Sequence, residues 1–310
     1  ALERADIAVF GPNRVAARLE SDKAFARGLM DRHNIEALPS FRVFDEFAPA
    51  VDYARTFDWK VAVKPTSLTD GLGVKVYCDQ LAGSAEVIDY IDEVLNMKKG
   101  GGRVLVEERL EGEEFTLQCF VNGDHIVPTP AVQDFKKLLP GDEGVNTASM
   151  GSYMSDNYLL PFMAKEDYDH ALDIIRKTIH AFQVETGAAC RGILYGQFML
   201  TASGVRLIEY NFRPGDPEWL NVMTVMKSSV LDVIIKVLRK EPVDIQFEKK
   251  PTVCKYVVPM GYPDRMDEVL DFRYDPAAFS RNKVVLYHSC GVDEKGRFKV
   301  GSERGIALIS

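Results

Sequence analysis

The sequence has few cysteines, and they are scattered. Five occur in 310 residues, with no C-x-x-C pair and no cluster of cysteine with histidine. This odd number and spacing predict neither a disulfide framework nor a structural zinc site. Reduced, buried thiols are the ordinary state of cysteine in the cytosol, so we expect a cytoplasmic protein.

Long apolar runs are also missing. The longest, such as VLDVIIKVL, are short and interrupted by charge, so we expect neither a membrane span nor a signal peptide. The net charge of −8 would repel the phosphates of nucleic acids and of anionic membranes. These features argue against a general nucleic-acid or membrane binder. The length is sufficient for two or three domains with cores of their own.

Neither of two common nucleotide-binding fingerprints is present in the glycine-containing loop at residues 64–76. This segment, KPTSLTDGLGVKV, has no G-K-[ST] and no G-x-G-x-x-G. Its backbone N–H groups around Gly71 and Gly73 could still hold phosphate oxygens, with Lys64 at the end of the preceding strand. A plain connection in a β-hairpin would explain the same residues.

Short strands mixed with helices predict an α+β or α/β fold. Residues 60–128 read as β-loop-β-α-β-β-β, with an amphipathic helix at 84–95, and predict a compact subdomain. A long helix is expected over 165–186, because a glycine follows it. Short strands dominate residues 251–310.

Two consecutive strands, at 193–200 and 205–212, predict a hairpin. They flank a three-residue turn at 202–204 whose last residue is glycine, which supplies the positive φ that such a turn requires. This turn places Gln197 directly opposite Glu209. Because side chains alternate along strands, odd-numbered residues share one face of the hairpin and even-numbered residues share the other.

The odd-numbered face carries oxygen-bearing side chains. Gln197, Glu209 and Asn211 lie on it together with Leu207, whereas Ile208 belongs to the expected core face. Carboxylate and amide oxygens suit Mg²⁺, which also binds substrate phosphates. A solvated sheet face with three unrelated polar residues is the alternative. The rigid Pro-Gly-Asp-Pro-Glu turn that follows favours the metal interpretation, because a solvent-facing strand does not need it.

Two glutamates flank a bend in VEERLEGEEFTL, residues 106–117. Glu107 and Glu114 lie on either side of Gly112, between two expected strands. Carboxylates in this position could accept hydrogen bonds from an adenine amine or from ribose hydroxyls. An exposed acidic turn is the ordinary alternative.

Seven segments, taken together, resemble the glycinamide ribonucleotide synthetase family of ATP-grasp ligases. In family order over nearly the whole chain, they are FGPNRVAARLESDKAF, VAVKPTSLTDGLGV, VLVEERLEGEEF, PTPAVQDFKK, DEGVNTASMGSY, GILYGQFML and LIEYNFRPGDPEWL. The resemblance implies an ATP-grasp fold, in which two α+β subdomains clasp ATP. It also implies a remnant of an N-terminal α/β domain at 1–20, an ATP-grasp domain at 21–245 with a smaller lid at about 60–128, and a partial β-rich C-terminal domain at 246–310.

The resemblance further implies a reaction of purine biosynthesis. Glycine, ATP and 5-phosphoribosylamine would give glycinamide ribonucleotide, ADP and phosphate through a glycyl phosphate. Such a transfer needs charge neutralisation and alignment more than acid–base chemistry. The implied cofactors are ATP and two magnesium or manganese ions, and the implied partners are the two small-molecule substrates.

The matching motifs imply a role for each site residue. The residues expected to bind ATP are Lys23, Lys64, Gly71, Gly73, Glu107, Leu110 and Glu114. Of these, the lysines are assigned to the phosphates, Glu107 and Leu110 to adenine, and Glu114 to the ribose. The expected metal ligands are Gln197, Glu209 and Asn211. The expected catalytic residues are Arg213, for the transferring phosphoryl group, and Asp216 and Asn146, on the side of glycine and phosphoribosylamine.

Three positions depart from the family pattern. Leu72 stands where the glycine-rich loop usually has lysine, Ala148-Ser149 replaces a Gly-Gly pair, and Pro214 replaces phenylalanine. The altered loop at 144–151 favours a ligase with a different amine acceptor as an alternative. Leu72 favours a nucleotide-binding module without catalysis, but the retained metal face favours an enzyme.

Overall fold

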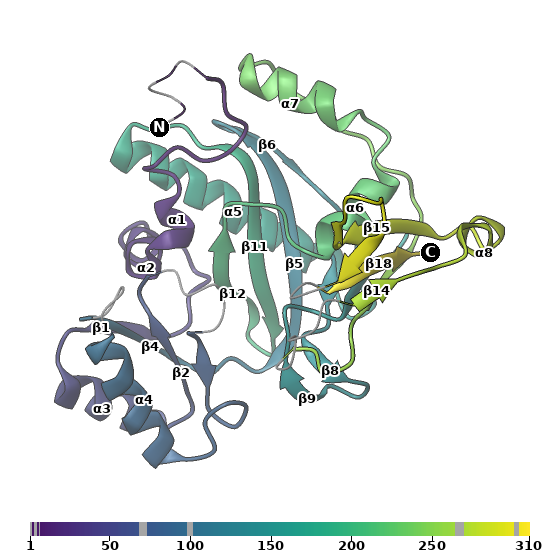
Figure 1. Ribbon diagram of the computed structural model, residues 1–310. Coiled ribbons are helices and arrows are strands. Elements are labelled where there is room, and N and C mark those ends of the chain that lie inside the picture. Colours follow the sequence, from purple (N-terminus) through teal and green to yellow (C-terminus); the bar gives the residue numbers. More distant parts are fainter. Residues whose placement is uncertain are drawn as a thin grey trace.

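The computed structural model describes residues 2, 5, 7–67, 73–97, 102–263, 270–300 and 304–310. Two four-stranded antiparallel sheets and one five-stranded antiparallel sheet form its frame. One four-stranded sheet, called here the smaller sheet, lies with its helices at the lower left of Figure 1.

The smaller sheet has the strand order β1-β4-β2-β3. Its strands are β1 (Phe41–Phe44), β2 (Val61–Pro65), β3 (Lys75–Val76) and β4 (Val104–Glu108). The helices α3 (Phe47–Arg55) and α4 (Ser84–Asn96) pack on it, as Figure 1 shows. The predicted apolar face of α4 is buried here, because Val87, Ile91 and Val94 pack with the strand residues Val61 and Val106.

The larger sheet has the order β12-β11-β5-β6. Its strands are β5 (Gly112–Asn122), β6 (His125–Pro128), β11 (Arg191–Thr201) and β12 (Gly204–Asn211). Three helices contribute to its core cluster, namely α1 (Arg18–Ser21), α2 (Lys23–Arg32) and α5 (Lys165–Thr186). As predicted, α5 ends at Gly187, which has a φ of 66°.

The division between the two sheets differs from the subdomain expected at 60–128. The strands β5 and β6 leave the smaller sheet, because β5 pairs with β11 along its whole length, from Asn122 opposite Arg191 to Gly112 opposite Thr201. The smaller sheet instead begins at Phe41 and ends at Glu108. The other domain boundaries stay predictions.

The third sheet joins the middle of the chain to its last strands, in the order β15-β18-β13-β10-β7. Its strands are β7 (Gln133–Asp134), β10 (Gly151–Met154), β13 (Thr252–Val257), β15 (Val285–Ser289) and β18 (Gly305–Ile309). The remaining elements are β8 (Lys137–Leu139), β9 (Glu143–Asn146), α6 (Glu218–Val225), α7 (Val230–Leu238), β14 (Leu270–Phe272), α8 (Pro276–Arg281), β16 (Gly291–Val292) and β17 (Phe298–Val300). Among the described residues, no helix is both long and apolar enough to span a bilayer.

Candidate active site

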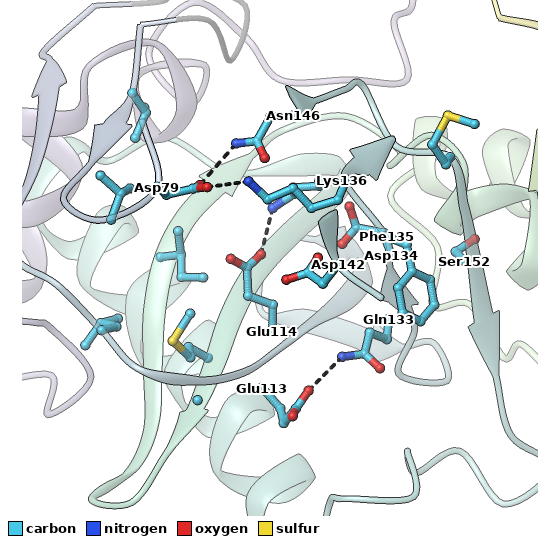
Figure 2. Close-up of a pocket in the computed structure, with 18 of the residues that line it drawn as sticks. Asp79, Glu113, Glu114, Gln133, Asp134, Phe135, Lys136, Asp142, Asn146 and Ser152 are labelled. Carbon is cyan, nitrogen blue, oxygen red and sulfur yellow. Dashed lines mark hydrogen bonds and ion pairs between the residues drawn. The ribbon is translucent and has the colours of Figure 1, made fainter. Parts of the chain in front are cut away.

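A cleft of about 1340 Å³ opens between the smaller sheet and the strands β5 and β7 to β10. Five predicted site residues line it, namely Lys64, Glu107, Leu110, Glu114 and Asn146. Small-ligand pockets usually measure roughly 300–1,000 Å³, so this cleft has room for a nucleotide and a second ligand. Figure 2 shows its polar wall, formed by residues from β5, β7 and the segment that follows β7.

A buried ion triad stands where the two four-stranded sheets meet. The carboxylate of Glu107 lies 2.5 Å from Nε of Arg27 and 2.6 Å from Nζ of Lys64. Burial would raise the pKa of Glu107, but the two cations and their hydrogen bonds hold it at about 2. This carboxylate pairs with Arg27 and Lys64 at the wall of the cleft, and its contact with the adenine amine stays a prediction.

The hairpin of β11 and β12 confirms that Gln197 pairs with Glu209. Beyond that pair the register shifts, so Phe198 faces Leu207 and Ile208 is an extra, bulged residue. The side chain of Leu207 consequently turns into the core and Ile208 lines the cleft, the reverse of the expected faces. The physical reason is the turn, in which only two residues separate Thr201 from its partner Gly204.

The bulge also joins the hairpin to the ion triad. The carbonyl of Ile208 accepts a hydrogen bond from Arg27 at 2.7 Å and a long one from Lys64 at 3.5 Å. Glu209 follows Ile208 directly in the chain. The metal face predicted on β11 and β12 therefore begins at the residue next to the one that contacts the two cations.

A third cation, Lys23, lies in the same region at the start of α2. Asp22 caps this helix by accepting a bond from the N–H of Phe25, and the N–H of Lys23 donates to Thr66 at 2.9 Å. Burial lowers the pKa of Lys23, and so do the charges of Lys64 and Arg27, while Glu209 opposes the shift. We did not predict Arg27 from the sequence, although its spacing of four residues from Lys23 places both on one helix face.

The three predicted metal ligands lie together. Nδ2 of Asn211 donates to Oε1 of Glu209 at 3.2 Å, and Nε2 of Gln197 donates to Oε2 of Glu114 at 2.7 Å. In the described part of the chain, no group of three or more His, Cys, Asp or Glu residues is placed to hold a metal. One carboxylate and two amides offer oxygen ligands of the kind that a hard ion accepts together with phosphates or water.

Arg213 extends from the end of β12 into solvent. Its Nε lies 3.5 Å from Oε1 of Glu20, and its guanidinium donates a long bond to Oδ1 of Asn211 at 3.4 Å. The structure thus places Arg213 beside the predicted metal ligands. Its long side chain is exposed, so it has freedom to approach a phosphoryl group.

Asp216 is linked to the altered loop at 144–151 through a residue that we did not predict. Its carboxylate accepts a bond from Tyr256 at 2.5 Å and pairs with Arg304. Arg304 also donates to the carbonyls of Ala148 and Ser149 at 2.5 and 3.0 Å. No sequence motif marked Arg304, which precedes β18, because its partners lie far away in the chain.

The altered loop keeps a glycine-like conformation. Ser149 has a φ of 87°, in the region that glycine adopts most readily. Its hydroxyl donates to the carbonyl of Gly151 at 2.9 Å, which stabilises this geometry. The replacement of the Gly-Gly pair has therefore not straightened the loop.

The remaining predicted residues lie toward the smaller sheet. Asn146 donates to Oδ2 of Asp79 at 3.4 Å, and Lys137 pairs with the same carboxylate, so the hairpin of β8 and β9 contacts the segment after β3 (Figure 2). The carbonyl of Gly73 accepts a bond from Tyr90 at 2.8 Å. Gly71 and Leu72 lie outside the described residues.

Comparison with known proteins assigns the chain to one family. Residues 21–219 match the model of the phosphoribosylglycinamide synthetase ATP-grasp (A) domain. The chain is 41% identical to a phosphoribosylamine–glycine ligase of Methanopyrus kandleri, over 99% of this chain and 70% of that protein. It is 44% identical to one of Methanobrevibacter smithii, over 100% of this chain and 71% of that protein. The chain belongs to the phosphoribosylamine–glycine ligase family.

Solved structures support the same fold. A phosphoribosylamine–glycine ligase from Thermotoga maritima matches with a TM-score of 0.86 at 24% identity, over all of this chain and 75% of that one. An N5-carboxyaminoimidazole synthase from Aspergillus clavatus, in complex with ADP and 5-aminoimidazole ribonucleotide, matches with a TM-score of 0.66 at 12% identity, over 99% of this chain and 72% of that one. The expected ATP-grasp fold of this ligase-family chain is therefore confirmed.

Proposed function

We propose that this chain ligates glycine to 5-phosphoribosylamine with ATP, giving glycinamide ribonucleotide, ADP and phosphate in purine biosynthesis. One observation carries the proposal. Gln197 pairs with Glu209, and the neighbouring Ile208 is the bulged residue whose carbonyl contacts Arg27 and Lys64. In a member of the phosphoribosylamine–glycine ligase family, this arrangement supports an oxygen-rich face beside two cations, of which Lys64 lines the cleft.

The chemistry needs neutralised phosphates and aligned reactants. An oxygen of the glycine carboxylate attacks the γ-phosphorus, ADP leaves, and a glycyl phosphate forms. The amine nitrogen of phosphoribosylamine then attacks the glycyl carbonyl carbon, phosphate leaves, and the nitrogen loses a proton. We assign Lys23 and Lys64 to the phosphates of ATP, because buried cations stabilise the charge of the transferring group. Glu107 acts here as a positioning residue for Lys64.

The predicted metal ligands fit magnesium or manganese. Gln197, Glu209 and Asn211 present oxygen donors on adjacent strands, and we assign two ions to this face. Such ions, when bound, neutralise charge on the phosphates. Arg213, beside Asn211, is assigned to the phosphoryl group in transfer.

The rest of the cleft is divided between the nucleoside and the substrates. We assign Leu110 to adenine and Glu114 to the ribose, while the backbone around Gly71 and Gly73 would cover the phosphates. Asp216 and Asn146 are assigned to the side of glycine and phosphoribosylamine. We further propose that the enzyme acts in the cytoplasm on these small molecules.

Product analysis tests this proposal directly. ADP release is measured with glycine and phosphoribosylamine supplied singly and together, in the presence of ATP and Mg²⁺. We expect stoichiometric ADP and glycinamide ribonucleotide with both substrates. ADP release with glycine and a different amine would replace the proposed acceptor. Nucleotide binding without ADP release under any of these conditions would contradict an enzymatic role.

A further inference from the structure

A carboxylate oxygen at the cleft wall is buried without a partner. Asp134 is the last residue of β7 and lies among the polar residues of the cleft in Figure 2. Within the part of the chain that the structure describes, its Oδ1 accepts no hydrogen bond. Buried acceptors are nearly always satisfied in folded proteins, so this oxygen indicates a missing donor.

A second buried carboxylate, Glu218 on α6, interacts electrostatically with Asp134. On β10, Ser152 pairs with Asp134 in register and hydrogen-bonds Asn221, which lies three residues after Glu218 on α6. Glu218 is 3% exposed and accepts a bond from the hydroxyl of Tyr195 at 2.8 Å. Burial, together with the charge of Asp134, raises the pKa of Glu218 to about 7. Burial also raises the pKa of Asp134, and Glu114 adds to the rise while Lys136 opposes it.

One lysine is shared among these acids. Nζ of Lys136 lies 2.7 Å from Oε2 of Glu114 (Figure 2). Although burial opposes the shift, the charges of Glu114, Asp134 and Glu209 raise the pKa of Lys136 above its ordinary value. Because the ammonium of Lys136 makes its short contact with Glu114, it compensates the charge of Asp134 only partly. A further cationic group near Asp134 is electrostatically favoured.

The amide of Gln118 offers a hydrogen-bond donor, without a partner in the part of the chain that the structure describes, on the face of the larger sheet that carries Tyr195. Gln118 of β5 is 1% exposed and pairs directly with Tyr195 of β11. Its Oε1 accepts a bond from the N–H of Gly215, which fixes the orientation of the amide. Its Nε2 has no partner among the described residues. The surroundings of Tyr195 thus offer both an unused acceptor and an unused donor, which suits a small zwitterion.

We propose that Asp134 binds the ammonium group of glycine, with Glu218 and Tyr195 as positioning residues behind it. This inference rests on the proposed function and deepens it. Tyr195 lies two residues before Gln197 on β11, roughly 7 Å along the strand. An amino acid held there could direct its carboxylate toward Gln197 and Glu209.

The substitution Asp134→Asn tests the inference, since it removes the charge and keeps the shape. We expect the KM for glycine to rise roughly ten- to 100-fold, because a hydrogen bond to a charged group is lost. The KM for ATP and the Mg²⁺ requirement should change little. Asp142→Asn is the matched control, because Asp142 is an exposed carboxylate that lines the same cleft.

A binding measurement separates a substrate contact from a structural role. Calorimetry on the protein loaded with ADP and Mg²⁺ compares glycine with acetate, which lacks the ammonium group. In the Asp134→Asn variant, glycine should bind no better than acetate, and the weak affinity for acetate should be unchanged. If this variant does not fold, Glu218→Gln should raise the KM for glycine by a smaller factor without affecting ATP.

Three outcomes would overturn the inference. An unchanged KM for glycine in the Asp134→Asn variant would do so while leaving the proposed function intact. A higher Mg²⁺ requirement and a higher KM for ATP would make Asp134 a metal ligand instead. A wild-type protein that does not use glycine would overturn both the inference and the proposed function.

Discussion

At the scale of single residues, the carboxylate of Glu107 links the smaller sheet to α2, which packs against the larger sheet. It belongs to β4 of the smaller sheet, and its partner Arg27 belongs to α2, which packs under the larger one. Arg27, Lys64 and Glu107 are all less than 5% exposed. Removing one member of a buried ion cluster leaves an uncompensated charge in the interior, which strongly destabilises the fold. Each of these three side chains therefore depends on the other two.

We therefore expect Glu107→Gln to lower the free energy of unfolding by about 3–5 kcal/mol, because it leaves two buried cations without their counter-ion. Chemical denaturation of both proteins measures the difference. Glu111→Gln is the control, since Glu111 is exposed and its pair with Arg109 should contribute at most about 1 kcal/mol. Equal losses in the two variants would contradict the assignment.

The same residue predicts a dependence on pH. The pKa of Glu107 is lowered from 4.5 to about 2, so folding favours the ionised carboxylate. The resulting stabilisation, roughly 3 kcal/mol, is complete above pH 4.5 and is lost as the pH falls toward 2. The stability gap between wild type and Glu107→Gln should narrow over this range. A gap that stays constant from pH 7 to pH 3 would exclude this explanation.

Arg304 ties three segments together, namely the turn after β12, the loop at 144–151 and β13. Arg304→Met keeps an apolar side chain but removes the guanidinium, which lies over the ring of Tyr256 and donates hydrogen bonds to Asp216 and to the loop carbonyls. We expect kcat/KM for glycine and phosphoribosylamine to fall at least tenfold, since about 1.4 kcal/mol of positioning energy suffices for this. Calorimetry should find nucleotide binding retained. A parallel loss of nucleotide binding would place Arg304 in the ATP site.

At the scale of elements, the hairpin of β11 and β12 shows which features can be predicted from the sequence and which cannot. The pairing of Gln197 with Glu209 follows from alternation and a short turn. The bulge at Ile208 cannot be deduced from the sequence in this way. A longer turn without a bulge and a turn one residue shorter with a one-residue bulge both place Gln197 opposite Glu209. The sequence therefore predicted the metal face, whereas the cation contacts made by the bulge required the structure.

At the scale of the whole molecule, the family and the fold class were predictable because seven motifs occur in family order. The division into sheets was not. The residues of β5 would allow it to pair with a strand of either four-stranded sheet. In the structure it pairs with β11 along its whole length and so belongs to the larger sheet. Contacts between distant segments, such as those of Arg27 with Glu107 and of Arg304 with Asp216, likewise depend on tertiary packing.

This architecture places the centre of the proposed site at the meeting point of the two four-stranded sheets. The smaller sheet supplies Lys64 and the larger sheet supplies Gln197 and Glu209. The chain spans about 70% of the curated relatives that it matches, and its own described residues already bring these groups together. We propose that Glu209 serves metal-dependent phosphoryl transfer at this point.

The most direct test is the Mg²⁺-dependent rate of ADP formation by Glu209→Gln, with glycine and phosphoribosylamine present. We predict a fall of about 10²–10³-fold or more, the size of loss that removal of one charge-stabilising group produces. The circular dichroism spectrum should stay unchanged. Glu113→Gln is the control, because Glu113 is an exposed carboxylate on β5 that lines the cleft, and the rate of this variant should match wild type. A near-normal rate in Glu209→Gln would contradict the metal site and the mechanism built on it.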